Sequence, residues 1–152
     1  MQRHLLCFRQ DSGQVLRSHR TKISLELAKK LAGAAQAEAA KNKWAMAIAV
    51  VDDGGNLVCF ERMDGAQLGS TEVAQQKART AVFFKRPTKA FEDNVLTDKH
   101  VVVLAVPNVV PVEGGLPLVV DGVLIGAIGV SGAKASEDGL VARSALDTVP
   151  LQ

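Results

Sequence analysis

An Asp-Gly pair at positions 121 and 122 separates two β-rich apolar runs, residues 116–120 and 123–131, and it constrains the fold more than any other feature. Both central residues of a type I′ turn need φ > 0, so the pair predicts a β-hairpin. Glycines are dense on both sides of it, at Gly114, Gly115, Gly126, Gly129 and Gly132. Because glycine has no Cβ, the backbone there can approach a ligand or another strand closely. The segment therefore predicts a hairpin that provides a scaffold next to a candidate binding site.

The other elements follow from apolar periodicity and from their boundary residues. Ser24 is an expected N-cap of one helix, and Ser70 stands ahead of a second helical face that ends before Pro87. Turn residues at 52–56 predict another hairpin. In chain order we expect a helix at 25–40, strands at 44–51 and 57–63, a helix at 70–85, a short helix at 88–95, a mostly irregular segment at 101–112, the second hairpin, and a helix at 136–146. Because neighbouring strands are joined by short hairpin turns, we expect an α+β domain with a central antiparallel sheet flanked by helices.

Composition excludes several kinds of partner. The 152 residues suffice for one domain with a substantial core. The 18 basic and 16 acidic residues form no basic stripe and aromatic residues make up only 4%, so we expect no nucleic-acid binding. No apolar stretch is long enough to span a bilayer, and residues 1–20 lack the apolar core of a signal peptide. We therefore expect a cytoplasmic protein with no membrane partner and, with only Cys7 and Cys59, no disulfide.

Several short motifs occur together and in a fixed order. They are the runs 47–52 (AIAVVD), 55–57 (GNL), 62–66 (RMDGA), 77–81 (KARTA), 113–117 (EGGLP) and 126–132 (GAIGVSG), followed by Asp138. This set resembles the GlcG/HbpS family, which also includes the C-terminal domain of PduO-type proteins. The resemblance implies a profilin-like or PAS-like layered domain, homo-oligomers from dimers to octamers and, in some members, haem binding. It divides the chain into an N-terminal extension at 1–22, a GlcG/HbpS-like domain at 23–147 and a C-terminal tail at 148–152.

Haem, the cofactor that the resemblance implies, needs an axial donor. His4 and His19 lie in the extension, where a solvated surface histidine is the simpler interpretation, whereas His100 precedes an apolar run and is a candidate to face a pocket. Cys59 and Met63 are soft donors, although such residues in a predicted strand more often fill the core. The sequence leaves His100, Cys59 and Met63 as candidate axial ligands.

A second set of candidate residues is polar and suits an anionic small ligand. Its members are Arg62, Asp64, Lys77, Arg79, Thr80, Glu113, Gly114 and Gly115. Lys77 and Thr80 share one helix face, with the amides of the double glycine expected opposite them, while Arg79 points elsewhere. A carboxylate suits such a pocket, either a haem propionate or a small organic acid. The alternative is that Arg62–Asp64 and Lys77–Glu113 contacts only stabilise the fold.

Hydrolytic and metal chemistry are not indicated. Ser131 lies in a glycine-rich turn, but Ala133 replaces the final glycine of a nucleophile elbow and no histidine is near in sequence. No His-x-x-His, Cys-x-x-Cys or His-Glu pattern occurs, so we expect no metal site. Residues 52–56 resemble the start of a calcium loop without its later acidic ligand, and a hairpin turn explains them better.

Three hypotheses for the function follow. The first is an oligomeric protein that binds an anionic small ligand, with haem or a related tetrapyrrole as the first candidate, for storage, sensing or slow degradation. The second is an enzyme acting on a small carboxylate or carbonyl compound, in which Lys77 or Glu113 moves a proton and the Gly114 and Gly115 amides hold developing negative charge. The third is a non-catalytic oligomeric accessory subunit without a ligand of its own.

Overall fold

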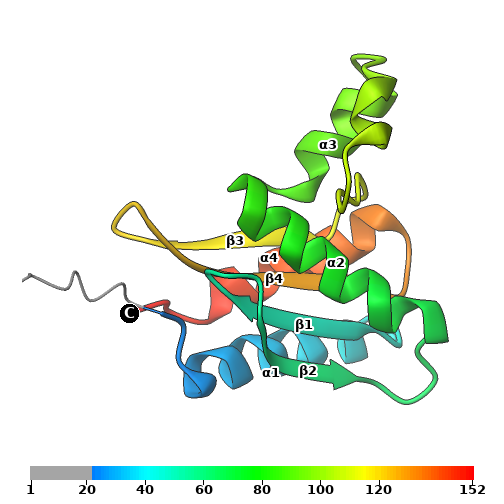
Figure 1. The fold of residues 1–152 in the computed structure, drawn as a ribbon. Coiled ribbons are helices and arrows are strands. Elements are labelled where there is room, and N and C mark those ends of the chain that lie inside the picture. Colours follow the sequence, from blue (N-terminus) through cyan, green and yellow to red (C-terminus); the bar gives the residue numbers. More distant parts are fainter. Residues whose placement is uncertain (1–21) are drawn as a thin grey trace, which may run out of the picture.

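The computed structural model describes residues 22–152, in which a four-stranded antiparallel sheet carries helices on both faces (Figure 1). The strands are β1 (Ala47–Asp52), β2 (Leu57–Arg62), β3 (Gly115–Val120) and β4 (Val123–Ser131), in the spatial order β2-β1-β4-β3. The helical elements are α1 (Leu25–Lys41), α2 (Leu68–Phe84), α3 (Thr88–Leu96), the 3-10 helix η1 (Val101–Ala105) and α4 (Ala135–Thr148). The expected α+β class, a central antiparallel sheet flanked by helices, is confirmed.

Both hairpins form as the turn residues predict. Asp121 and Gly122 have φ of 49° and 77°, the positive values that a type I′ turn requires, and they join β3 to β4. In the other hairpin, the Asp52 side chain accepts the N–H groups of Gly54 and Asn56, each at 2.9 Å. The central pairing is between β1 and β4, which brings the two hairpins into one sheet.

The two faces of the sheet are covered differently. Helices α1 and α4 pack on one face over a core that includes Leu31, Ile48, Ile128 and Val141. Helix α2 packs on the other face over small residues, among them several alanines of α2, β1 and β4. A Cβ built on Gly129 of β4 would overlap the backbone of α2, so the helix lies unusually close to the sheet. This close approach explains why position 129, one of the glycines around the second hairpin, has no side chain.

The helix ends lie within two residues of the expected ones, with the largest differences at the start of α2 and the end of α4. Ser24 caps α1 and accepts a hydrogen bond from Leu27 N at 3.1 Å, as expected. Helix α2 begins at Leu68 with Gln67 at its N-cap, so the prediction that it begins at Ser70 is wrong. The Ser70 hydroxyl is buried against the Ser131 hydroxyl at 3.3 Å, which is a tertiary contact and not a cap. None of the helices in residues 22–152 combines the length and apolarity needed to cross a bilayer.

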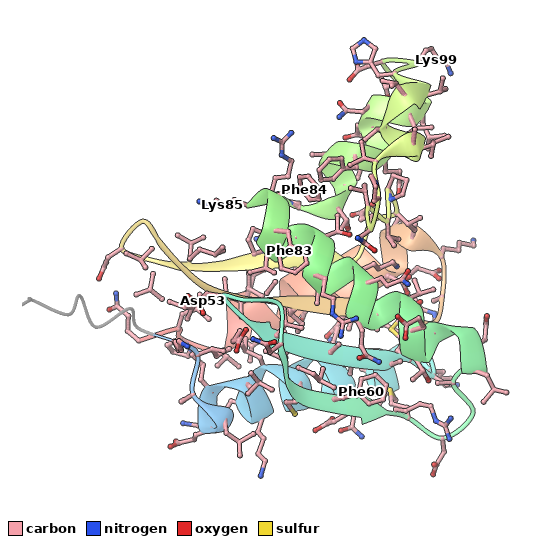
Figure 2. All side chains as sticks on the ribbon, viewed as in Figure 1. Asp53, Phe60, Phe83, Phe84, Lys85 and Lys99 are labelled. Carbon is pink, nitrogen blue, oxygen red and sulfur yellow. The ribbon has the colours of Figure 1, made fainter. Side chains whose placement is uncertain are left out.

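Helix α3 and η1 form an arm that projects away from the sheet (Figure 1). At its base, Phe84 of α2 meets Phe91 of α3 edge to face, with ring centroids 5.3 Å apart. Figure 2 shows Phe84 near this base and Lys99 near the outer end. Part of the segment expected to be mostly irregular is therefore the short helix η1, and the arm presents much of its apolar surface to solvent.

Candidate functional site

A buried ion pair between Lys77 of α2 and Asp138 of α4 lies at the end of the sheet where β4 finishes. The Lys77 Nζ donates to Asp138 Oδ2 at 2.7 Å and to the Val130 carbonyl at 3.1 Å. The other carboxylate oxygen of Asp138 accepts the N–H of Ala133 at 3.0 Å. The two side chains are only 1% and 3% exposed. The pair therefore ties α2, β4 and the start of α4 together inside the protein.

Burial dominates the electrostatics of Asp138. Removal from water raises the pKa of its carboxyl, while the Lys77 ammonium and the N–H groups of Ala133 and Gly132 oppose that rise. A charge in this position is costly unless its partner stays in place. The ammonium of Lys77 is thus committed to Asp138 and not to Glu113, the partner considered in the sequence.

The double glycine lies directly over this pair. Gly114 has φ of 132°, and a Cβ there would be 2.6 Å from the Val130 carbonyl and 2.9 Å from the Lys77 Nζ. Gly115 N donates to Thr88 Oγ1 at 2.9 Å, so its amide has a partner within the protein. Only glycine fits at position 114, because both the backbone conformation and the space exclude a side chain.

A pocket of about 420 Å³ opens beside the double glycine, between the start of α3 and the first turns of α4. Glu113 lines it, and its backbone N donates to Glu92 Oε2 at 2.7 Å. The carboxyl of Glu113 lies against Gly139, where a Cβ would overlap it. Partial burial raises the pKa of Glu113, and the carboxylates of Glu92 and Asp93 raise it further, while the Lys89 and Lys77 ammonium groups lower it. Glu113, Gly114 and Gly115 are therefore together at one pocket, as the sequence indicated.

The remaining polar candidates lie elsewhere. Arg62 and Asp64 are exposed at the end of β2, and the order β2-β1-β4-β3 puts three inter-strand steps, about 14 Å, between β2 and β3. The Thr80 hydroxyl is buried, donates to the Asn108 carbonyl at 3.2 Å and accepts the Val110 N–H at 3.0 Å. Thr80 therefore fixes the segment that returns from the arm, and the expected grouping of Arg62, Asp64 and Thr80 with the double glycine does not form.

The candidate axial ligands also occupy different places. His100 is exposed at the N-cap of η1 on the arm. Cys59 and Met63 are partly buried against the core on the α1 face, and burial raises the pKa of the Cys59 thiol. His4, His19 and Cys7 lie outside the described residues. Within residues 22–152 no cluster of three or more His, Cys, Asp or Glu side chains could hold a metal ion.

Residues 23–147 match the family model described as haem degrading protein HbpS-like. The chain belongs to the HbpS-like family. Protein GlcG of Escherichia coli (strain K12) is 44% identical over 109 residues, which are 72% of this chain and 81% of that protein.

Solved structures extend the similarity to three dimensions. The structure of a double mutant of HbpS from Streptomyces reticuli has a TM-score of 0.81 and 30% identity, covering 97% of this chain and 99% of that one. The crystal structure of a PduOC–heme complex has a TM-score of 0.76 and 30% identity, covering 86% of this chain and 99% of that one. The HbpS-like fold thus accounts for nearly all of the described residues.

Proposed function

We propose that this HbpS-like protein binds haem or a related tetrapyrrole, for storage, sensing or slow degradation. The description of its family and its similarity to PduOC, which was solved with heme, support the proposal. Within the chain, the observation that carries it is the arm, where a histidine stands beside exposed apolar side chains.

The arm offers a nitrogen donor beside an apolar surface, and both support the proposal. His100, Val102, Val103 and Val106 line a largely apolar hollow of about 450 Å³. Val102 is 74% exposed, so a large apolar ligand can reach it without rearrangement of the core. Histidine is a common axial ligand of haem iron, and the faces of the macrocycle are apolar. These residues fit a haem held by His100, and a bound haem would supply a redox-active iron at the arm.

The other two candidate ligands fit less well. Cys59 is a thiol whose pKa is raised by burial, whereas the thiolate is the form that ligates haem iron. Met63 packs against the core beside α1. Both side chains are partly covered by the core, whereas His100 is exposed, so His100 is the ligand we propose.

Titration of the tag-free protein with hemin tests the proposal. We expect saturable binding of one hemin per subunit with a sharp Soret band distinct from that of free hemin. His100→Ala should weaken binding at least about tenfold, because the iron loses its protein ligand. Visible absorption spectra recorded at increasing hemin concentrations measure both effects.

His4→Ala and His19→Ala are matched controls, since each removes one imidazole outside the described residues. Both variants should bind hemin as the unmodified protein does. A spectrum identical to that of free hemin would refute haem binding by this chain. Full hemin binding by His100→Ala would refute the role of His100 as the ligand but not haem binding itself. A loss in one of the controls would then point to that histidine instead.

We also infer that the chain forms a homo-oligomer, from a dimer to an octamer. Apolar side chains exposed on the arm outside the hollow of His100 support this, because monomers rarely leave large apolar patches in solvent; they include Leu96, Val101 and Leu104. Light scattering on the eluting protein should give a mass that is a multiple of 16.1 kDa. A mass of one chain at all concentrations would contradict the inference.

A further inference from the structure

The pocket beside the double glycine is distinct from the haem surface of the arm, and it has features of an anion site. Its position between α3 and α4 is fixed by the Lys77–Asp138 pair, which holds the start of α4 against β4. Its volume of about 420 Å³ lies within the range of small-molecule pockets. The pocket therefore has walls that are held in place by the fold, at the end of the sheet.

Among residues 22–152, Lys89 and Arg143 are the cations that line this pocket, and within that part of the chain only Arg143 has no ion-pair partner. Lys89 Nζ is 2.7 Å from Asp93 Oδ1 and 3.5 Å from Glu92 Oε1, so its charge is already compensated. Arg143 of α4 also lines the pocket, and it has no ion pair or hydrogen bond with any residue in 22–152. The pocket therefore offers one uncompensated positive charge, in the planar form that matches a carboxylate.

A backbone donor in the pocket is also free. Gly114 is buried and lines the pocket, yet its N–H makes no hydrogen bond within residues 22–152. Buried amides are rarely left without an acceptor, and an oxygen of a ligand or a water would satisfy this one. On the other side, Leu116 and Leu140 provide an apolar wall. Together these groups suit a short carbon chain that ends in an anion.

The charge balance selects the type of anion. The carboxyl groups of Glu92, Asp93 and Glu113 all lie at or near the pocket, and they outnumber its two cations. Arg143 can pair with one negative charge on a ligand, whereas any further charge would meet only these carboxylates and be repelled, so a phosphate dianion is disfavoured relative to a singly charged group.

We propose that the pocket binds a small monocarboxylic acid, whose carboxylate is held by the Arg143 guanidinium and the Gly114 N–H and whose carbon chain lies against Leu116 and Leu140. Glu113 lies at the same pocket, where a hydroxyl or carbonyl group on the ligand would meet its carboxyl. This site does not depend on haem binding by the arm.

Titration with propionate, followed by amide NMR, tests the site. Propionamide is the neutral probe of the same shape, and inorganic phosphate is the dianionic probe. We expect saturable shifts of the Gly114, Gly115 and Gly139 signals with propionate, with a dissociation constant on the order of 1 mM for a ligand of so few atoms. Arg143→Gln should weaken binding at least about tenfold, because the free charge is lost.

Lys41→Gln is the matched control, since Lys41 is an exposed cation in the last turn of α1 and lies outside the pocket. It should leave propionate binding unchanged. Gly139→Ala gives a second test. Its Cβ would overlap the Glu113 carboxyl, so the flexible Glu113 side chain must move within the pocket. The helix itself should tolerate the change, because alanine has a higher helix propensity than glycine. This variant should fold and bind propionate more weakly.

Four outcomes would overturn the proposal. They are no saturable shift with propionate, equal binding of propionamide, tighter binding of phosphate, and equal weakening by Arg143→Gln and Lys41→Gln. Hemin binding measured on Arg143→Gln separates the two sites, because the arm lies outside this pocket. A loss of propionate binding with intact hemin binding supports two independent sites.

Discussion

Replacing Lys77 with methionine is expected to lower the free energy of unfolding by about 3 to 5 kcal/mol. Methionine fills a similar volume, but it leaves the Asp138 carboxyl inside the protein without the ammonium that lies 2.7 Å from it. Because the Asp138 side chain is only 3% exposed, water cannot replace the lost ammonium as its partner. Chemical denaturation followed by far-UV circular dichroism measures the change.

A double variant separates the ion pair from general damage to the core. Lys77→Met combined with Asp138→Leu removes both charges, and such replacements of buried pairs are often neutral or stabilising. The double variant should therefore recover much of the stability that the single variant loses, which gives a favourable coupling energy. If Lys77→Met alone remains within about 1 kcal/mol of the unmodified protein, the pair does not hold this end of the fold.

The features that could be predicted from the sequence are those set by neighbouring residues. The positive φ of Asp121 and Gly122 follows from the chemistry of two adjacent residues, and the Ser24 cap follows from a serine three residues before Leu27. Because the strands come as two such hairpins, the antiparallel sheet also follows. The double glycine beside Glu113 could be recognised as a pocket-lining segment for the same local reason.

The partner of Lys77 could not be predicted, because it depends on contacts between distant segments. Asp138 is 61 positions away, and only the pairing of β1 with β4 and the return of α4 bring the two together. An acidic residue in the first turn of a helix already has a local explanation in the helix dipole. The sequence around Asp138 therefore does not indicate that its carboxyl has a buried partner.

The start of α2 was mispredicted for a related reason. A serine ahead of an apolar helical face normally indicates a cap, but Ser70 lies inside the helix and its hydroxyl is used by Ser131. The true first residue, Leu68, is 79% exposed and so contributes no apolar periodicity. The sequence likewise favours a ligand as the partner of Thr80, whereas its hydroxyl holds the segment at 108–110, which only the folded arm brings close.

The glycine-rich end of β4 leads to the second large expected effect, which is at Gly129. A Cβ at this position would overlap the Ala74 carbonyl oxygen and lie 2.6 Å from the Ala78 N. Both atoms belong to the backbone of α2, so no side chain can rotate away and the whole helix must shift. The small-residue core between α2 and the sheet would then open. Gly129→Ala should lower the free energy of unfolding by about 3 kcal/mol or more.

Gly33→Ala provides the matched control, because Gly33 is exposed within α1 and nothing lies within 4 Å of the added Cβ. That variant should gain roughly 0.5 to 1 kcal/mol from the better helix propensity of alanine. Denaturation curves of the two variants compare the same chemical change in a closed and an open environment. Equal effects at Gly129 and Gly33 would contradict the close approach of α2 to the sheet, and with it the reason that β4 requires glycine at this point.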